Sequence, residues 1–365
     1  MSADSQDTLR LGAVGDMLLL TDPASGRPDR KPQDIFRNCP SLFAGCDVVL
    51  GNLECTLSGD GKVVPTEPRV VATPELVEGI APAGFHIVSL ANNHTFDCMD
   101  EGFARTRRQL DDMCVAHFGA GANLEDACLP AIVTVKGLRL AFLGVVEPRC
   151  GKCQVATAES QGVCPLDVDE LARRIARLKK EVHHVIVSIH WGDERFLIPS
   201  PQQVLQAHAL ADAGASLILG HHPHVVQGLE TYRGVPIAYS LGNFVATEVP
   251  FTNGDHVTWG WFGRQGCLLM VELNESACVN VRQVSTFDDG CQVAPDSTRR
   301  GRRRIAKANR LVERGVSVRR YQWEHLLVNT IRPIIGHLRL SSLRRLRPAH
   351  LRKALAGIAQ ARKVK

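Results

Sequence analysis

Short apolar runs that each end in polar residues recur along this chain, and this pattern constrains its fold more than any other feature. Five runs rich in Val, Ile and Leu predict strands buried on both faces, because a half-exposed strand would alternate apolar and polar residues. They span residues 9–14, 47–50, 85–91, 185–189 and 216–219. Helical patterns at 102–113, 167–182 and 201–213 lie between or after them, the last with Ser200 as a candidate N-cap.

The later part of the chain has a different order of predicted elements. Strand patterns at 235–239, 266–272 and 279–284 follow one another with Gly and Asn turns and no long helix. We therefore expect an α/β body whose last third is mostly antiparallel.

Polar side chains follow each of the five predicted strands. In open α/β sheets the loops at the carboxyl ends of the strands converge, so these side chains are expected to share one site. They are Asp16, Asn52, Glu54, Asn93, His94, His190, His222 and His224. Carboxylate, amide and imidazole groups without a thiolate suit a divalent transition metal (Mn, Fe or Zn) in a hydrolytic site. The pattern predicts one or two such ions.

Each of these motifs taken alone has an ordinary structural interpretation. Gly15-Asp16 is typical of a turn, and Asn92-Asn93-His94 fits a turn with a surface histidine. The pair His222 and His224 is more specific, because alternate residues of an extended chain point to the same side. The coincidence of five such features at strand ends favours the metal site.

In this order, the motifs resemble those of the bacterial capsule-synthesis family of the CapA type. That family is associated with poly-gamma-glutamate and capsular polymer production and is similar to the calcineurin-like metallophosphoesterases. The resemblance covers about residues 9–285. It rests on GD (15–16), GNLE (51–54), SLANNH (89–94) with Asp97, GAG (119–121), HWG (190–192) with Glu194, GHHPH (220–224) and YSLGNF (239–244).

The resemblance implies a four-layer α/β/β/α sandwich of the metallo-dependent phosphatase type, with a metal centre at one sheet edge. It implies that Asp16, Asn93, His190, His222 and His224 are metal ligands, with Asn93 on the second metal. It places His94 beside the leaving-group oxygen as a proton donor. Asp97, three residues further on, would then fix the tautomer of His94 and raise its basicity.

Two positions depart from the superfamily pattern. The first motif usually adds a ligand as Asp-x-His, but this chain has Leu18 there. The usual bridging Asp is Asn52, and a neutral amide is a poorer bridge between two dications than a carboxylate. Glu54, two residues on, is the candidate replacement, so both Asn52 and Glu54 are retained as candidate ligands.

Three functions are consistent with these residues. The first is a metal-dependent phosphoesterase acting on a phosphorylated glycan or lipid intermediate in capsular polysaccharide or poly-gamma-glutamate synthesis. The second is a non-catalytic or weakly catalytic accessory subunit of a polymer synthase that binds the anionic polymer, and the third is a metal-dependent amide hydrolase acting on that polymer. Candidate substrate contacts are Trp191, Glu194, Arg195 and Asn243.

Charge divides the chain into two parts. Residues 299–365 carry 20 basic and two acidic side chains, whereas residues 1–298 carry 23 basic and 36 acidic ones. We expect a family-like domain over 1–290 and a basic, helical extension over 291–365, broken at Pro333 and Pro348. Leucines between Leu338 and Leu355 alternate with Arg and Lys. That pattern fits peripheral contact with an anionic membrane surface, packing on the body, or binding of a polyanion, with no specific nucleic-acid partner expected.

The N-terminal residues are polar and acidic, and no apolar run approaches the roughly 20 residues needed to span a bilayer. We therefore expect a cytoplasmic protein without signal peptide or transmembrane helix, in contact with the inner face of the membrane if the tail binds lipid. The twelve cysteines are then expected to be reduced thiols. Cys150, Cys153 and Cys164 lack an obvious fourth zinc ligand nearby, so unpaired loop thiols are favoured over a zinc site.

Overall fold

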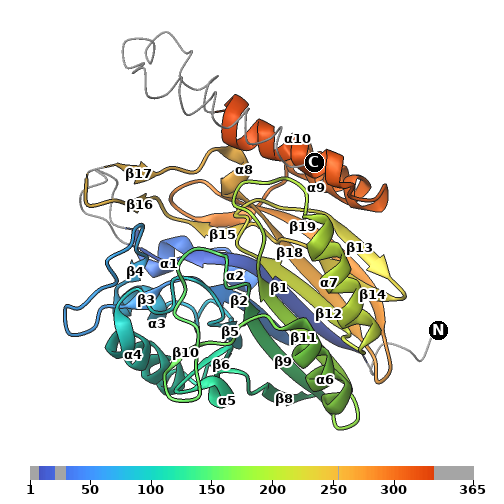
Figure 1. Ribbon diagram of the computed structural model, residues 1–365, viewed down its shortest axis with the longest axis horizontal. Helices are drawn as coiled ribbons and strands as arrows, with labels where there is room; N and C mark the ends of the chain where they lie inside the picture. Colours follow the sequence, from blue (N-terminus) through green and yellow to red (C-terminus); the bar gives the residue numbers. More distant parts are fainter. Residues whose placement is uncertain (1–7, 21–29, 254, 333–365) are drawn as a thin grey trace.

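The computed structural model of the chain describes residues 8–20, 30–253 and 255–332. Two large β-sheets lie face to face at its centre (Figure 1). The first has the order β20-β19-β18-β1-β2-β5-β6, with β15 beside the far end of β1. Its strands are β1 (Leu9–Leu18), β2 (Val48–Leu53), β5 (Ile87–Ser89), β6 (Ala116–Phe118), β15 (Asn243–Ala246), β18 (Gln265–Leu273), β19 (Cys278–Asp288) and β20 (Val293–Pro295).

The second sheet has the order β13-β14-β12-β11-β9-β8. Its strands are β8 (Ala131–Val135), β9 (Leu138–Val146), β11 (His184–His190), β12 (Leu217–His221), β13 (Leu229–Tyr232) and β14 (Val235–Ala238). Strands β9, β11, β12 and β14 are parallel, as are β1, β2, β5 and β6 in the first sheet. The carboxyl ends of both parallel sets thus carry the loops that build the site.

Three two-stranded pairs and a set of helices complete the structure. The pairs are β3 (Thr56–Leu57) with β4 (Val71–Ala72), β7 (Ala120–Gly121) with β10 (Gly162–Val163), and β16 (Val249–Pro250) with β17 (His256–Val257). The helices are α1 (Pro32–Ile35), α2 (Cys39–Leu42), α3 (Pro74–Glu78), α4 (Met99–Asp112), α5 (Leu124–Ala127), α6 (Val168–Leu178), α7 (Pro201–Asp212), α8 (Trp261–Arg264), α9 (Arg299–Glu313) and α10 (Val318–Leu326), followed by a π-helical turn at Leu327–Ile331.

Alternating side chains of the buried strands form two separate apolar cores. Between the sheets lie residues such as Leu9 and Leu11 from β1 and Leu140 and Phe142 from β9. The intervening residues of the same strands pack under the helices, with Val14 of β1 as one example. Because successive strand residues point to opposite faces, a strand covered on both faces is apolar throughout, as the short runs predict.

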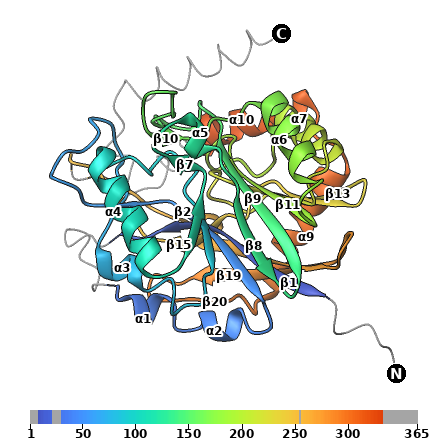
Figure 2. The same cartoon turned by 90° about the horizontal axis from the view of Figure 1, so that it is seen from below.

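The layers follow from these two cores. Helices α1–α4 lie on the outer side of the first sheet, and α6 and α7 lie on the outer side of the second (Figure 2). The predicted four-layer α/β/β/α sandwich is therefore confirmed. The last third is mostly antiparallel as predicted, since β18, β19 and β20 pair antiparallel.

The predicted elements differ from the observed ones mainly at their ends. Strand β1 continues through Gly15 and Asp16 to Leu18, beyond the end predicted at residue 14. A Cβ on Gly15 would lie 1.8 Å from the carbonyl oxygen of Gly242, so this glycine permits the close approach of two chain segments. Helix α7 begins as predicted with Ser200 as its N-cap, in a reciprocal capping box with Gln203.

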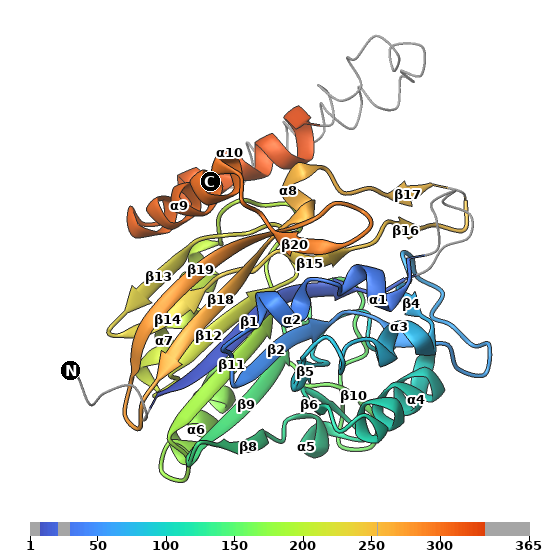
Figure 3. The ribbon, with the colours of Figure 1, turned by 180° about the vertical axis from the view of Figure 1, so that it is seen from behind.

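Helices α9 and α10 lie at the same end of the molecule (Figure 3). Helix α9 buries Ile305, Ala308 and Val312, and a Cβ on Gly228 would lie 2.4 Å from Val312 Cγ2. The first part of the basic extension therefore packs on the body of the protein. The first sheet continues to Pro295, past the boundary expected at residue 290. The leucine-rich stretch 338–355 lies outside the described residues, as do Pro333 and Pro348.

One expectation about the cysteines is wrong. Cys164 forms a disulfide with Cys128, while Cys150 and Cys153 are free. The bridge joins the residue after α5 to the residue after β10, two places 36 residues apart that only the fold brings together. Within the described part of the chain, no helix combines the length and hydropathy of a membrane span.

Candidate metal centre

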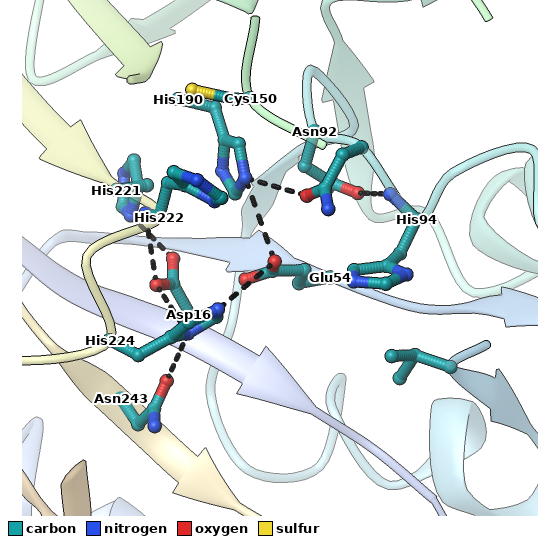
Figure 4. A network of polar contacts seen from close by, with 12 residues as sticks. Asp16, Glu54, Asn92, His94, Cys150, His190, His221, His222, His224 and Asn243 are labelled. Carbon is teal, nitrogen blue, oxygen red and sulfur yellow. Dashed lines mark hydrogen bonds and ion pairs between the residues drawn. The ribbon is translucent and has the colours of Figure 1, made fainter. Parts of the chain in front are cut away.

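The predicted polar residues gather at the carboxyl ends of the two parallel sets of strands (Figure 4). Asp16 lies in β1, Asn52 lies near the end of β2 with Glu54 just beyond it, and His190 is the last residue of β11. Asn93 and His94 follow β5, and His222 and His224 follow β12. The face-to-face sheets thus bring side chains together from positions as distant as residues 16 and 224.

Glu54 lies at the middle of this cluster. Its carboxylate belongs to two groups of side chains, each with its ligand atoms within 4.8 Å of one another: Glu54 with His222 and His224, and Asp16 with Glu54 and His190. It is fully buried, and neither oxygen accepts a hydrogen bond from the described residues. The nearest imidazole nitrogens, Nε2 of His190 and of His224, lie 3.6 and 3.7 Å from Oε1, too far for hydrogen bonds.

A buried carboxylate without hydrogen bonds is unfavourable unless a cation compensates it. Accordingly, burial raises the pKa of Glu54 well above its usual value. The two groups of oxygen and nitrogen donors that contain Glu54 suit a divalent metal. The same geometry favours Glu54 over Asn52 as the shared ligand.

Asp16 is held by a set of hydrogen bonds. Its Oδ1 accepts one from Asn52 Nδ2 at 2.8 Å and lies 3.1 Å from His221 Nδ1, and its Oδ2 accepts one from the backbone N–H of His222 at 3.2 Å. Burial alone would raise the pKa of Asp16, but the hydrogen bonds from His221 and His224 hold it well below its usual value. The carboxylate is therefore charged and oriented.

Asn52 uses both ends of its amide inside the protein. Nδ2 donates to Asp16, and Oδ1 accepts a hydrogen bond from Asn92 Nδ2 at 3.1 Å. This amide therefore orients Asp16, and its oxygen is already engaged. As a metal ligand, Asn52 stays a prediction.

His190 lies between the two sides of the cluster. Its Nε2 is 2.8 Å from Asn93 Oδ1, and its Nδ1 is 3.4 Å from Asn52 Nδ2. Burial, reinforced by nearby His222, lowers the pKa of His190 well below its usual value, so the ring is neutral. A neutral imidazole is the form that binds a metal ion.

His222 and His224 adopt backbone conformations that non-glycine residues rarely take. Their φ angles are 93° and 55°, which place them in the left-handed region. Such strain tends to occur at functional sites, where the surrounding structure holds it. The two imidazoles therefore reach Glu54 from a twisted loop and not from the extended strand that the His-x-His spacing predicts.

The two imidazoles differ in charge. Burial lowers the pKa of His222 to about 4, and its Nδ1 has no hydrogen-bond partner among the described residues. Burial opposes a charge on His224 too, but the carboxylates of Glu54 and Asp16 raise its pKa to about 10. Bound cations would replace that proton as the partner of the two carboxylates.

His94 and Asp97 are close together as predicted. His94 Nδ1 lies 2.7 Å from Asp97 Oδ2, which also accepts a hydrogen bond from the backbone N–H of Val70 at 2.7 Å. Asn92 accepts a hydrogen bond from the backbone N–H of His94 at 3.1 Å and so orients this turn. The pair leaves Nε2 of His94 available to a substrate.

Two of the four predicted substrate contacts are corrected by burial. Trp191 is fully buried, stacks on Tyr239 and donates its indole N–H to the Tyr239 carbonyl, so it packs the core. Asn243 is also fully buried: its Oδ1 lies 2.8 Å from His224 Nδ1, and its Nδ2 donates to the Gly263 carbonyl. It holds His224 in place.

The other two predicted contacts, Glu194 and Arg195, are exposed on the loop after β11. The backbone N–H of Arg195 donates to the Pro223 carbonyl at 2.8 Å, which ties this loop to the His-x-His turn, and Arg195 has a left-handed φ of 65°. Although burial acts to raise the pKa of Glu194, the positive charge of nearby His224 lowers it below its usual value. Both side chains stay candidates for contact with an anionic or polar substrate.

Two residues of this cluster are absent from the sequence-based prediction. His221 is buried with Nδ1 on Asp16, and its Nε2 has no hydrogen-bond partner in the part of the chain that the structure describes. Asn92 joins Asn52 to the backbone of His94. Both stand beside predicted residues, but nothing in the sequence shows that their side chains point inward.

Comparisons with known proteins agree with this set of motifs. The chain is 33% identical over 244 residues to the PGA biosynthesis protein CapA of Bacillus subtilis (strain 168), covering 66% of this chain and 64% of that protein. It is 35% identical over 219 residues to the capsule biosynthesis protein CapA of Bacillus anthracis, covering 58% and 53%. A probable polyglutamine synthesis accessory protein of Mycobacterium tuberculosis is 33% identical over 210 residues, covering 54% and 55%. The chain thus spans between half and two thirds of the length of these relatives.

The similarity of this chain to solved structures is low, both in sequence identity and in TM-score. A putative 5'-nucleotidase from Staphylococcus aureus is 14% identical with a TM-score of 0.47, covering 82% of this chain and 58% of that one. A hypothetical protein from Thermus thermophilus is 16% identical with a TM-score of 0.48, covering 76% and 98%. At these values the likeness adds nothing to the assignment, which rests on the sequence. The family described as "Bacterial capsule synthesis protein PGA_cap" matches residues 10–248, and the chain belongs to that family.

Proposed function

We propose that this protein is a metal-dependent hydrolase of the phosphoesterase type that acts on a phosphorylated intermediate in the synthesis of an anionic capsular polymer. The observation that carries the proposal is the buried carboxylate of Glu54, which accepts no hydrogen bond from the described residues and is shared by two groups of metal-ligand side chains. The relatives of this chain that are named for PGA and capsule biosynthesis support a role in the synthesis of such a polymer.

Asp16, Glu54, His190, His222 and His224 would hold one or two divalent ions, with Asn93 beside them. When bound, such ions supply Lewis-acid polarisation and a water molecule of lowered pKa. The identity of the metal, among Mn, Fe and Zn, is part of the proposal because the donor set of oxygen and nitrogen suits all three.

The residues around the metal ligands supply proton transfer. His94 donates from Nε2 to the leaving-group oxygen, and Asp97 on Nδ1 stabilises the doubly protonated ring that makes this possible. Asp97 is itself held by the Val70 N–H, so the pair is oriented before substrate binds. A protein that only bound polymer would have little use for such a pair.

A second candidate is an accessory subunit that binds the anionic polymer without hydrolysing it. Leu18 favours it, because this apolar side chain stands where the superfamily usually has a histidine ligand and is only 2% exposed. The relative named as an accessory protein supports it as well. A third candidate function is hydrolysis of the polymer's amide bonds by the same metal-activated water.

The test measures bound metal and hydrolysis together. Protein purified without chelator is analysed for Mn, Fe and Zn, then assayed with an aryl phosphodiester and with poly-gamma-glutamate, with and without added Mn²⁺. We expect bound metal and Mn²⁺-dependent phosphodiester hydrolysis that drops about 10²- to 10⁴-fold in His94→Gln. The matched control is His117→Gln, which removes a second His–Asp pair, with Asp111 at 3.0 Å, outside the site.

The other outcomes separate the alternatives. Bound metal without hydrolysis of either substrate would establish the accessory role, and shortening of the polymer without phosphodiester hydrolysis would establish the amide hydrolase. Protein that binds no metal at all would refute the metal centre.

A further inference from the structure

A pocket of about 560 Å³ lies between α8, α9 and α10, away from the metal ligands. The three helices are close together at one end of the molecule in Figures 1 and 3. Its walls also include Leu197 and Ile198, from the segment that precedes α7. The pocket therefore joins the basic extension to the body and contains none of the residues proposed for catalysis.

The pocket is strongly cationic. Its lining includes a single acidic side chain, Glu324, and six basic ones, which are Arg300, Arg303, Arg304, Lys307, Arg320 and Arg332. Four of the six follow one another at helical spacing on a single face of α9. An excess of cations in a concave wall favours an anionic ligand.

Only some of these cations have a role within the protein. Arg304 is buried and donates to the Val226 carbonyl, and the guanidinium of Arg300 lies 3.9 Å from the centre of the Trp261 ring. Glu324 accepts a hydrogen bond from the Leu197 N–H at 2.9 Å and faces Arg332 at 3.8 Å. Arg303 and Lys307, by contrast, are exposed and form neither an ion pair nor a hydrogen bond with any residue that the structure describes.

Apolar side chains border the same cations. Trp323 is 56% exposed, Phe262 41% and Leu327 36%, although each is large and apolar. A hydrophilic polyanion would use the cations and leave these three side chains in water. A ligand with both an anionic and an apolar part would use the cations and the apolar side chains together.

We propose that this pocket docks the protein on an anionic phospholipid surface. Arg303 and Lys307 bind lipid phosphate groups, and Trp323 and Phe262 enter the boundary between headgroups and acyl chains, where aromatic rings beside cations are favourable. This site is distinct from the leucine-rich stretch 338–355 and does not rest on the proposed hydrolase activity.

The test uses full-length protein and sedimentation with vesicles of phosphatidylcholine alone or mixed with phosphatidylglycerol. We expect binding to the mixed vesicles only, weakening as salt rises. The variant Arg303→Glu with Lys307→Glu should bind about tenfold or more weakly, because each basic group near such a surface contributes substantially to binding. The matched control is Arg302→Glu with Arg310→Glu, which makes the same charge change at two exposed α9 positions outside the pocket.

A second variant tests the apolar part. Trp323→Ala, at a half-exposed position, should keep the melting temperature and still weaken binding to the mixed vesicles. Equal losses in the pocket and control charge variants would overturn the proposal, because general charge would then explain binding. Binding to neither vesicle, or sedimentation unchanged by the pocket variants, would overturn it too. Binding of soluble poly-gamma-glutamate that is lost in the pocket variant, without vesicle binding, would identify a polymer site instead.

Discussion

Glu54 is a buried carboxyl group that accepts no hydrogen bond from the described part of the protein. Its two oxygens are buried without partners there, at the point where two sets of ligands meet. An ionised carboxylate is costly in the interior, and burial accordingly raises the pKa of Glu54 well above its usual value. In the proposed metal centre, this side chain would be the ligand common to both groups.

The variant Glu54→Gln tests this directly. We expect it to lose most of its bound metal, because an amide is a weaker bridge than a carboxylate. The metal-free variant should be as stable as the metal-free wild type or more so, since burial already disfavours the charged form of Glu54 and the amide is neutral. Metal analysis and thermal melts with and without chelator measure both effects. Glu230→Gln, an acid bonded to Tyr239 outside the site, is the control and should keep its metal; unchanged metal in Glu54→Gln would contradict the assignment.

Asp97 is the second residue whose role can be isolated. Asp97→Asn keeps an acceptor for the Val70 N–H but no longer stabilises a protonated His94. We expect kcat for phosphodiester hydrolysis to fall about 10- to 100-fold with metal content unchanged. The decrease should be largest for substrates with poor leaving groups, which need the proton most. An equal decrease for good and poor leaving groups would argue against proton donation.

At the scale of residues, the sequence predicts which side chains can bind a metal better than it predicts where those side chains point. The sequence predicts that Asp16, His190, His222 and His224 lie close together, because each follows or ends a buried strand, and the structure brings them into one cluster. Trp191 and Asn243 are predicted as substrate contacts, but both are fully buried. Residue type and neighbourhood in the chain are the same for a side chain that points into the core and for one that points into a cleft.

At the scale of elements, the close packing of α9 on the body depends on one glycine, Gly228. A Cβ on Gly228 would lie 2.4 Å from Val312 Cγ2 and 2.6 Å from the Ala308 carbonyl, so the helix rests directly on the Gly228 backbone. This contact explains how a helix with seven basic residues still packs on the body: its small and apolar face is turned inward.

The variant Gly228→Ala should therefore push α9 outward and destabilise the protein by about 1–3 kcal/mol. Chemical denaturation measures the change. Gly260→Ala is the control, because a Cβ there meets no atom within 4 Å and the φ angle is −70°. Equal stability of the two variants would show that α9 does not rest on Gly228.

The ends of the elements are the hardest part to predict. Apolar runs locate β1 and β11 well, because burial on both faces makes such strands apolar throughout. The continuation of β1 to Leu18 could not be predicted, since this part of the strand pairs with β2 and with β15, which is more than 200 residues later. A glycine beside an aspartate usually indicates a turn, and only the approach of Gly242 shows otherwise.

At the scale of the whole molecule, the basic extension is part of the folded unit as far as it is described. Ile305, Ala308 and Val312 of α9 are buried, and Glu324 of α10 accepts a hydrogen bond from the Leu197 N–H. Packing is one of three interpretations that the sequence leaves open, because an amphipathic basic helix has the same pattern whether it faces a membrane or a protein.

Two truncations separate these contributions. Deletion of residues 299–365 removes α9 and α10 and should expose the apolar surface under them, which lowers the melting temperature or causes aggregation. Deletion of residues 333–365 leaves both helices in place and should keep the melting temperature. Thermal melts and light scattering measure both. A deletion of 299–365 that melts like the full chain would show that the helices add no stability.

The position of β1 sets the order in which the chain can fold. This strand precedes all its partners in the sequence, yet it lies in the middle of the first sheet, with Leu9 opposite Leu273 and Asp16 opposite Asn243. At about 5–20 residues per second, its partners β15 and β18 leave the ribosome roughly 10 to 50 seconds later. During that interval one edge of β1 lacks its partner strands, and a nascent chain that stops short of β18 exposes an unpaired, apolar strand edge on which other chains can aggregate.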